Sequence, residues 1–540
     1  MKMELPEIPL QERTPLVETL LGVIRQLLDR VQELEQTNQQ LRDEIAKLKG
    51  QKPRPDIKPS RLESSAKAKT RQGRQRRGRA EPPDAEAHID REVVLHPDNL
   101  PVGATLKAYE PFVVQELILR TETTRYLRAR YDLPEGGSVL APLPGDIVSV
   151  EGGHFGATLI TYILDQYHQA QVTEPLLLEQ LWEYGIKISA GQLHYILTEN
   201  KEYFHQEKAE VLWAGLTASR YIGADDTGAR HQGVNGYCTA IGNELFSYFE
   251  STASKSRVNF LQVLQGAQRL YVINEITLIY WERQKFLVAA VKALAEGPRE
   301  FTGEQAWQSR LDELGITDER HVRMATEGTL LGGLVASGVS PQLGIVSDGA
   351  DQFVLFVHGA CWIHAERPLA KLVPYHEEHR AAIENIRTQI WELYQKLKAY
   401  RQKPNKAQKA KLEACFDALV DQRTGYSSID NVLKDMRHHK VDLLRVLERP
   451  EMPLHNNAVE SDIREFVKRR KISGGTRNDA GRRCRDTFAS LKKTCRKLGL
   501  RFWDYLRDRI RGLGQIPRLT ALIAQKAQAL SAKKAAAVPA

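Results

Sequence analysis

The chain has 540 residues, of which 42% are hydrophobic, and it carries a formal net charge of +9 and five cysteines. Because a single domain usually spans about 100–200 residues, this length predicts several domains with sizeable cores. The cysteines form no C-x-x-C pair, which disfavours a disulfide framework, and the lack of an apolar N-terminal signal or a long uncharged apolar run disfavours export and membrane spanning.

Positive charge is concentrated in two blocks of the sequence. Residues 51–79 contain eleven Lys or Arg against two acidic residues, and residues 464–501 contain fourteen against three. Each cation near a phosphate releases a condensed counterion, so both blocks favour nucleic acid as a partner. A disordered linker, basic for solubility, is the alternative for the first block. The DNA contacts expected from that block come from Arg71, Arg74, Arg76, Arg77 and Arg79.

Residues 16–49 have the repeat of a coiled coil. Apolar side chains recur in steps of three and four, with β-branched residues frequent at the a positions, leucine at d, and Asn38 at one a position. This pattern favours a parallel two-stranded coiled coil, in which the buried Asn fixes the register. A single amphipathic helix packed on its own protein is the alternative. The Pro-rich, basic residues 51–92 that follow predict a flexible arm.

The next segment predicts a small β-rich unit followed by helices. Phe112–Leu119 has the composition of a strand, and a helix is expected from about Ala157 to Gln169. Helices at Glu174–Tyr184 and Ser189–Thr198, joined by a glycine turn, match a helix-turn-helix. Contacts to DNA would then come from Lys187 and Gln192, although a helical hairpin without any DNA contact gives the same pattern.

Three acidic residues occur in separate local settings. Asp225 is expected near the end of the first strand of a meander whose other strands are Gly236–Ile241 and Leu245–Glu250. Asp348 ends an apolar run, and Glu460 opens an amphipathic helix. If the three carboxylates converge, they can hold two Mg²⁺ ions, which prefer anionic oxygen ligands and can activate a phosphodiester for substitution.

Each acid also has a purely structural explanation. Asp225 and Asp348 could be turn residues, since Asp followed closely by Gly is common in turns. Asn457 and Glu460 together have the spacing of a capping box, with Asn as the N-cap and Glu at the third helical position.

Taken together, these motifs resemble a bacterial DDE transposase of the insertion-sequence-66 family. The resemblance covers roughly residues 16–510. The matching strings are Ala224-Asp225-Asp-Thr-Gly, Ser347-Asp348-Gly, Cys361-Trp-Ile-His364-Ala-Glu-Arg367, His455-Asn-Asn457-Ala-Val-Glu460-Ser-Asp-Ile-Arg464 and Arg470-Lys471-Ile-Ser-Gly-Gly.

The resemblance implies an RNase H-like core in which Asp225, Asp348 and Glu460 hold two Mg²⁺ or Mn²⁺ ions. The implied reactions are cleavage of double-stranded DNA at the element's ends and strand transfer into target DNA. Family position favours Asp225 over Asp226, and strand alternation points the two to opposite faces. Supporting roles fall to His364, Asn457 and Arg464, and DNA contacts to Lys468, Arg470, Lys471 and Arg477.

Two details qualify the resemblance. Zinc at Cys361 and His364 would need two more ligands, which no neighbouring C-x-x-C or H-x-H string supplies. Members of the family often carry a Cys-based zinc segment before the helix-turn-helix, whereas residues 80–150 here contain no cysteine. That segment therefore either folds without metal or has lost its function.

The predicted protein is a multidomain α+β chain. Long helices are expected at 281–296, 383–397, 407–421 and 428–447. Its predicted parts are a coiled coil (1–50), a basic arm (51–92), a small β-rich segment without zinc ligands (93–153), a helix-turn-helix region (154–215), an RNase H-like core (216–475) with helical insertions at about 271–340 and 366–454, and a basic C-terminal region (476–540).

We expect a cytoplasmic, nucleoid-associated bacterial protein with no membrane contact, assembled as a homodimer or higher oligomer through residues 16–49. Accessory proteins encoded by the element are further candidate partners. The alternatives are a non-catalytic, domesticated DNA-binding dimer and a metal-dependent phosphoesterase for small substrates. The phosphoesterase alternative predicts that the basic blocks are dispensable.

Overall fold

The computed structural model describes residues 89–99, 103–114, 116–145, 147–150 and 153–536. The chain separates into two units, Met1–Ile118 and Leu119–Ala540. The predicted coiled coil at 16–49 and the arm arginines 71–79 lie outside the described residues, so both stay predictions.

The predicted strand at Phe112–Leu119 is wrong for the residues that the structure describes there, which form neither helix nor strand. Phe112 is 89% exposed and Leu117 is 77% exposed. Apolar composition favours a strand only where a second strand and a core are present to pack against. The described part of 93–129 likewise contains no strand, so the β-structure of this region is confined to residues after 129.

Short hairpins and a group of helices begin the second unit. The strands are β1 (Arg130–Asp132), β2 (Ser138–Leu140), β3 (Ile147–Val150) and β4 (Gly153–Gly156), and the helices are α2 (Ala157–His168), α3 (Glu174–Glu183), α4 (Ala190–Thr198) and α5 (Glu202–Ala218). The predicted helices α2, α3 and α4 are confirmed. Ser189 caps α4 in a reciprocal capping box with Gln192. The turn before it uses Gly185 at φ 76°, a conformation that glycine adopts without strain.

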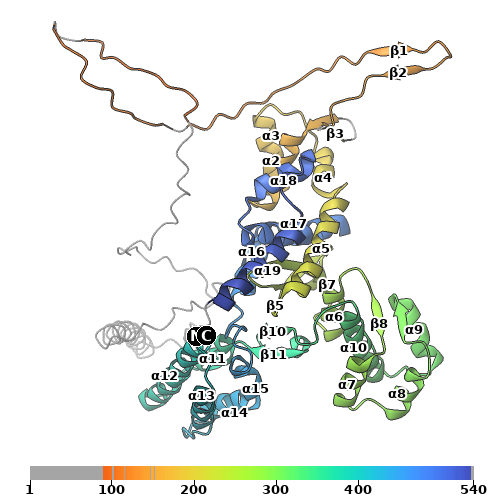
Figure 1. The fold of residues 1–540 in the computed structure, drawn as a ribbon, viewed down its shortest axis with the longest axis vertical. Coiled ribbons are helices and arrows are strands. Elements are labelled where there is room, and N and C mark those ends of the chain that lie inside the picture. Colours follow the sequence, from red (N-terminus) through yellow and green to blue (C-terminus); the bar gives the residue numbers. More distant parts are fainter. Residues whose placement is uncertain (1–88, 100–102, 115, 146, 151–152, 537–540) are drawn as a thin grey trace, which may run out of the picture. The chain divides into compact units, whose positions relative to one another are not determined.

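A mixed five-stranded sheet lies at the centre of this unit (Figure 1). Its strands are β5 (Tyr221–His231), β6 (Val234–Gly242), β7 (Ser247–Thr252), β10 (Gly344–Ser347) and β11 (Val357–Ala360), in the spatial order β11-β10-β5-β6-β7. β5, β6 and β7 form the predicted antiparallel meander, while β10 runs parallel to both β5 and β11. Gln232 and Gly233, both at positive φ, form the tight turn between β5 and β6, as expected for a two-residue hairpin.

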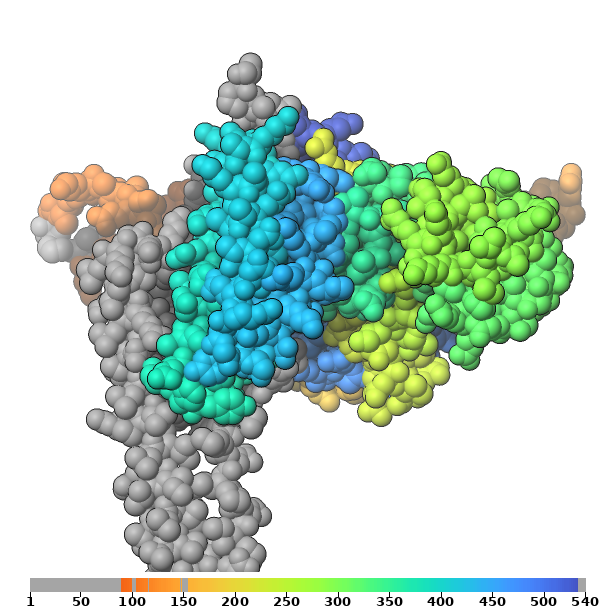
Figure 2. Space-filling model, turned by 90° about the horizontal axis from the view of Figure 1, so that it is seen from below, coloured from red at the N-terminus to blue at the C-terminus, as the bar shows by residue number. Residues whose placement is uncertain are grey.

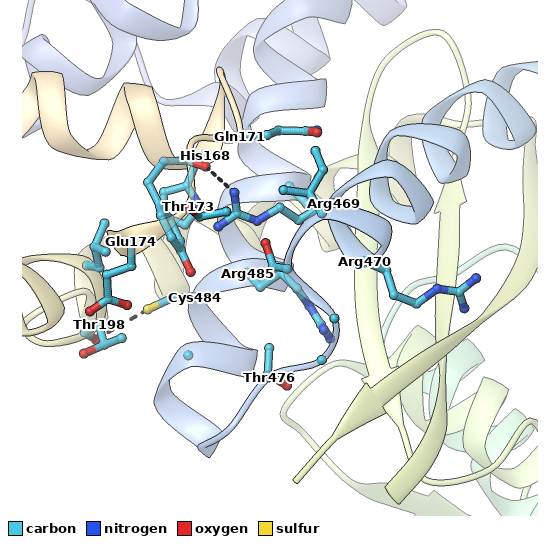
Figure 3. A pocket seen from close by; sticks show the side chains of 18 of the residues that line it. His168, Gln171, Thr173, Glu174, Thr198, Arg469, Arg470, Thr476, Cys484 and Arg485 are labelled. Carbon is cyan, nitrogen blue, oxygen red and sulfur yellow. Dashed lines mark hydrogen bonds between the residues drawn. The ribbon is translucent and has the colours of Figure 1, made fainter. Parts of the chain in front are cut away.

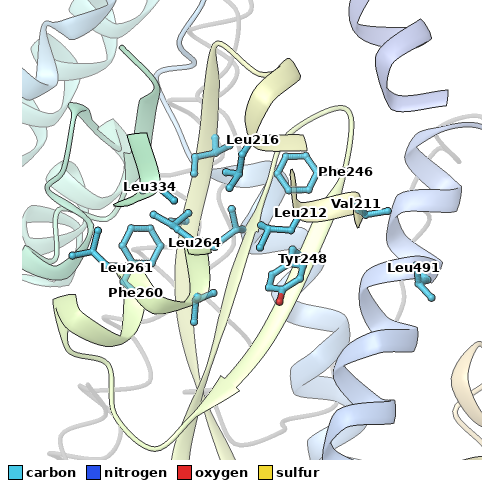
Figure 4. Close-up of a cluster of buried hydrophobic side chains, with 14 of the residues drawn as sticks. Val211, Leu212, Leu216, Phe246, Tyr248, Phe260, Leu261, Leu264, Leu334 and Leu491 are labelled. Carbon is cyan, nitrogen blue, oxygen red and sulfur yellow. The ribbon is translucent and has the colours of Figure 1, made fainter. Parts of the chain in front are cut away.

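Helices cover the sheet. Against one face packs α16 (Asn457–Ser473), through Val459, Ile463 and Phe466. A larger core joins the other face to α5 and to helices before β10 (Figure 4). In that core Leu212 and Leu216 of α5 share a cluster with Leu264.

The edge strand β7 is protected by α17 (Asp479–Lys497). The backbone N–H groups of Ser247, Phe249 and Ser251 donate to the side chains of Thr494, Ser490 and Asp486, respectively. Those three side chains recur every four residues, so one helix face satisfies alternate donors of the strand and closes an edge that would otherwise be open to pairing. Helices α18 (Phe502–Arg511) and α19 (Leu519–Ala536) follow.

The segment between β7 and β10 combines helices with a small hairpin. Its elements are α6 (Arg257–Gln265), β8 (Leu270–Val272), α7 (Glu275–Arg283), α8 (Val288–Ala295), β9 (Glu300–Thr302), α9 (Glu304–Glu313) and α10 (Glu319–Ala336). The single helix predicted at 281–296 is wrong. Lys285 at φ 54° breaks it, and Phe286 N–H bonds back to Trp281 O at 2.9 Å. An apolar period alone does not reveal such a break.

The segment between β11 and α16 is helical and has its own core. Its elements are α11 (Trp362–Lys371), α12 (Glu377–Tyr400), α13 (Lys406–Val420), α14 (Ser427–His438), α15 (Lys440–Leu443) and η3 (Arg445–Leu447), with η2 (Asp351–Phe353) before β11. The predicted helices at 383–397 and 407–421 are confirmed, and the one at 428–447 is broken at His439. In Figure 2 this segment, cyan to blue, and the green segment before β10 form two distinct masses. None of the helices within the described residues is both long and apolar enough to cross a membrane.

Candidate active site

Asp225 lies in the middle of β5, where it pairs with Ala240 of β6. The prediction that it stands near the strand's end is wrong, because β5 continues through Thr227 and Gly228 in register with β6 as far as His231. This position also excludes the turn explanation for Asp225.

Asp348 follows β10 directly. The register pairs Val346 with Gly223, and extending it by two residues sets Asp348 beside Asp225 on the neighbouring parallel strand. Asp348 is exposed, and its Oδ1 accepts the N–H of Ala350 at 3.1 Å, next to Gly349 at φ 94°. The turn explanation for Asp348 is therefore correct as far as it goes, since one carboxylate oxygen serves the turn.

Glu460 lies in the first turn of α16, and Asn456 fixes that helix against β5. Asn456 Nδ2 donates to Ala224 O at 2.7 Å. A Cβ added at Gly223 would lie 2.3 Å from Asn456 Oδ1, so this close approach requires glycine there. Asn456 is the N-cap and makes no side-chain cap hydrogen bond. The capping-box explanation for Glu460 is wrong, which leaves its carboxylate free to face the sheet.

His364, on α11, lies beside Glu460. Its Nδ1 lies 3.7 Å from Glu460 Oε1, and both atoms are buried without a hydrogen-bond partner. Among the described residues, Cys361, His364 and Glu460 are the group whose potential metal-ligating atoms all lie within 4.8 Å of one another. The sequence does not indicate that Glu460 joins Cys361 and His364, since it lies almost a hundred residues after them in the chain. Asp225 and Asp348 lie outside this tight group.

The pKa of Asp225 shows the influence of the other two carboxylates. Burial, followed by the charges of Asp348 and Glu460, raises the pKa of Asp225 to about 7. Like charges that face each other in a partly dry site disfavour joint ionisation unless a cation is near. Asp226 has different surroundings, because its Oδ1 accepts from Thr239 at 2.6 Å and its Oδ2 from Gln352 at 3.0 Å.

A buried chain of side chains supports the turn that carries Asp348. Ser347 Oγ accepts the N–H of Gly349 at 3.1 Å and lies 2.9 Å from His358 Nε2. His358 Nδ1 lies 3.2 Å from Asp442 Oδ2, within ion-pair range but outside hydrogen-bond geometry. Ser347 is completely buried, so it cannot act as a nucleophile, although serine, histidine and aspartate follow one another in these contacts. The segment between β11 and α16 therefore reaches the site through Asp442.

The remaining predicted residues fall into two groups. Arg464 lies near the carboxylates, with Nη2 at 3.9 Å from Glu460 Oε2. Asn457 is exposed, and its neighbour Asn456 holds the sheet instead. Lys187 and Gln192 lie at the α3–α4 turn and on α4, where Gln192 Oε1 is committed to the cap of that helix.

The basic residues predicted after Glu460 lie at the other end of α16 or beyond it. Lys468 and Lys471 are exposed, whereas Arg470 donates to Gly228 O and lines a cavity together with Arg477. None of these four is a neighbour of the carboxylates in the contacts given for the described residues.

This arrangement suits a divalent cation. Three carboxylates supply hard oxygen donors, and the unpartnered His364 Nδ1 and Glu460 Oε1 are the kind of buried polar atoms that a ligand satisfies. Burial raises the pKa of the Cys361 thiol to about 11, so that sulfur stays protonated without a metal beside it.

Comparison with known proteins identifies the family. A family profile described as "Transposase IS66 family" matches residues 350–483, which include His364 and Glu460. The chain is also 42% identical over 321 residues to "Uncharacterized protein y4jO" of Sinorhizobium fredii (strain NBRC 101917 / NGR234), a match that covers 59% of this chain and 100% of that protein. The motifs, the fold around them and these matches agree: the chain belongs to the IS66 family of transposases.

Proposed function

We propose that this protein cleaves DNA at the ends of an insertion element and transfers the freed 3′ ends into target DNA, using divalent metal ions held by Asp225, Asp348 and Glu460. Membership of a transposase family makes it a DNA-processing enzyme. The observation that carries the finer proposal is the shared electrostatics of three carboxylates, contributed by β5, the end of β10 and α16.

The sheet supports an RNase H-like core. Three antiparallel strands followed by two parallel ones, in the order β7-β6-β5-β10-β11, set the middle of β5, which carries Asp225, next to the end of β10. The helix that carries the last acid packs across β5 and β6. We propose that two segments are insertions in this core. The first lies between β7 and β10 and includes the hairpin β8–β9, and the second lies between β11 and α16.

Bound Mg²⁺ would supply Lewis-acid stabilisation of the attacking and leaving oxygens of a phosphodiester. The chain's own residues have distinct tasks. Asp225, rigid within the sheet, and Asp348, on its turn, would hold the ions from one side, and Glu460 from the other. Asn456 fixes the distance between α16 and β5, while His364 Nδ1 faces Glu460 and can accept or donate a proton there.

The test uses the full chain with linear DNA that carries the element's own ends, in Mg²⁺ or Mn²⁺, and reads nicks at the boundary by denaturing electrophoresis. We expect cleavage that EDTA abolishes. Intact boundaries in both metals, from a chain that binds the DNA, would refute the catalytic proposal and leave a DNA-binding protein.

A further inference from the structure

A second site lies at the C-terminal end of α16. A cavity of about 800 Å³ opens between the end of α2, helices α3 and α4, the loop after α16 and the start of α17 (Figure 3). Small-molecule sites in proteins typically measure about 300–1,000 Å³. The cavity can therefore hold one nucleotide, but not an intact base pair with its two backbones.

Positive charge in this cavity exceeds what its own carboxylates can neutralise. The acids that line it already have nitrogen partners: Glu465 lies 2.6 Å from the ammonium group of Lys493, and Glu174 lies 3.3 Å from the imidazole of His194. Asp462, the remaining acid, lies 2.7 Å from Lys497.

Three lining arginines have no such partner. Arg469 donates to the carbonyls of Tyr167 and Val172, and Arg470 donates to that of Gly228. Among the described residues, neither they nor Arg477 form an ion pair with a carboxylate. Guanidinium groups whose charge is unmatched favour a phosphate, which they can bind through two N–H groups at once.

The walls also suit a base. Tyr167, Leu178 and Phe466 line the cavity, and the guanidinium of Arg469 lies 4.0 Å from the centre of the Tyr167 ring. His168, which also lines it, has a buried Nε2 without a hydrogen-bond partner. Burial lowers the pKa of His168 well below its ordinary value, so the ring is neutral and offers one donor or acceptor.

We propose that this cavity takes up a single nucleotide of the bound DNA, extruded from the double helix, with its phosphate at Arg469 and Arg477 and its base against Tyr167 and His168. The inference rests on the proposed function, because it requires DNA along this face. Enzymes that act on DNA pay unstacking energy for such extrusion and recover part of it in a fitted pocket.

The position along α16 relates the two sites. Arg469 and Glu460 are nine residues apart on one helix, or roughly 14 Å at 1.5 Å per residue. That corresponds to about four stacked nucleotides at 3.4 Å each. The nucleotide held in the cavity would thus lie within a few nucleotides of the phosphate at the carboxylates and would fix the register of cleavage.

The test places 2-aminopurine at each adenine in turn near the cleavage boundary of an element-end duplex. The full chain binds this duplex in EDTA, where no cleavage occurs. We expect a several-fold rise in fluorescence at one position and at none of its neighbours. Ala190→Trp, which fills the cavity from an exposed lining position, and Arg477→Gln, at its exposed rim, should each remove most of that rise. The control is Arg501→Ala, an 85% exposed side chain outside the cavity, which should retain it.

DNA binding is measured in the same samples by anisotropy, and cleavage separately after Mg²⁺ is added. Bound DNA without a localised rise, a rise that both cavity variants retain, or a failure to bind DNA would each overturn the inference. Normal cleavage with no fluorescence rise leaves the proposed function intact, whereas a localised rise without any cleavage supports the cavity and contradicts the catalytic proposal.

Discussion

The two ends of α16 carry opposite charges and serve different proposed partners. Glu460, in its first turn, acts with Asp348 to raise the pKa of Asp225, whereas Arg469 and Arg470, in the last turns, line the cavity. This order agrees with the helix dipole, which favours anions at the N-terminus and cations at the C-terminus. A charge separation of this kind therefore stabilises the helix, and it places an anionic group at one end and cationic groups at the other.

The two ends of α16 also differ in how many of their charged side chains have hydrogen-bond partners within the protein. At the acidic end the charges of Asp348 and Glu460 help to raise the pKa of Asp225, and Glu460 Oε1 has no hydrogen bond. At the basic end Arg469 and Arg470 already donate to backbone carbonyls. The acidic end should thus respond strongly to metal, protons and mutation, and the basic end more gradually to DNA and salt.

The largest effect should come from removing one carboxylate. Asp348→Ala should reduce cleavage by more than about 100-fold, the loss expected when one preorganised group leaves a catalytic site. DNA binding should survive, because Asp348 is exposed and is no partner of Lys468, Arg470, Lys471 or Arg477 in the contacts given for the described residues. Rates of nicking and binding isotherms measure the two effects. Equal losses of cleavage and binding would indicate a DNA-binding role for Asp348 instead.

The acidic end should also make the metal-free protein sensitive to pH. The pKa of Asp225 is about 7 in the fold, against an ordinary 3.8, so the folded state binds an extra proton between these values. Its contribution to the free energy of unfolding is complete below about pH 4 and is lost as the pH rises to about 7, by up to about 4 kcal/mol for three pKa units.

Thermal unfolding in EDTA across this range measures the trend. Asp225→Asn, which carries no titrating group, should flatten it, and Mg²⁺ should raise the midpoint more at pH 8 than at pH 6 because it competes with the proton. A midpoint of the EDTA-treated protein that rises from pH 4 to pH 7 would contradict the assigned direction.

A smaller effect is expected from weakening the side-chain contacts that support the turn of Asp348. Asp442→Asn should loosen the chain of His358 and Ser347, and so raise the Mg²⁺ concentration needed for half-maximal cleavage by about 10-fold, the typical cost of losing a partner behind a metal ligand. The maximal rate at saturating Mg²⁺ should fall less. Asp435→Asn, an exposed acid that pairs with a histidine in the same segment, is the matched control. A fall in rate with an unchanged Mg²⁺ requirement would refute this role.

The sequence predicts elements whose signal is local. The apolar periods of α2, α12 and α13 and the Ser189 cap lie within single segments, and the structure confirms them. Local signals mislead where packing against distant residues determines the secondary structure or the contact. Residues 112–119 look like a strand, yet no strand pairs with those of them that the structure describes. At α16, Asn457 has the spacing of a cap, but the contact with β5 belongs to Asn456.

The residues of the candidate sites also divide into those with a local sequence signal and those without one. Sequence motifs give Asp225, Asp348 and Glu460, because each stands in a distinctive local string. The support of Ser347 by His358 and Asp442 has no local signal, since it joins a strand end to a helix about a hundred residues later. The cavity is likewise invisible in sequence, because the surplus of charge depends on which arginines lack a carboxylate partner after folding.

The smallest effect should come from the exposed lysines at the basic end. Lys468→Gln and Lys471→Gln should each weaken DNA binding by a few-fold at low salt and reduce the slope of log K against log salt by about 1, as for the loss of one phosphate contact. Cleavage at saturating DNA should not change, because neither side chain contacts the carboxylates. Lys406→Gln, an exposed lysine of α13, provides the control for a simple change in net charge. If all three variants have the same slope as the unmodified chain, the DNA does not follow this end of α16, and the contrast between its two ends concerns stability alone.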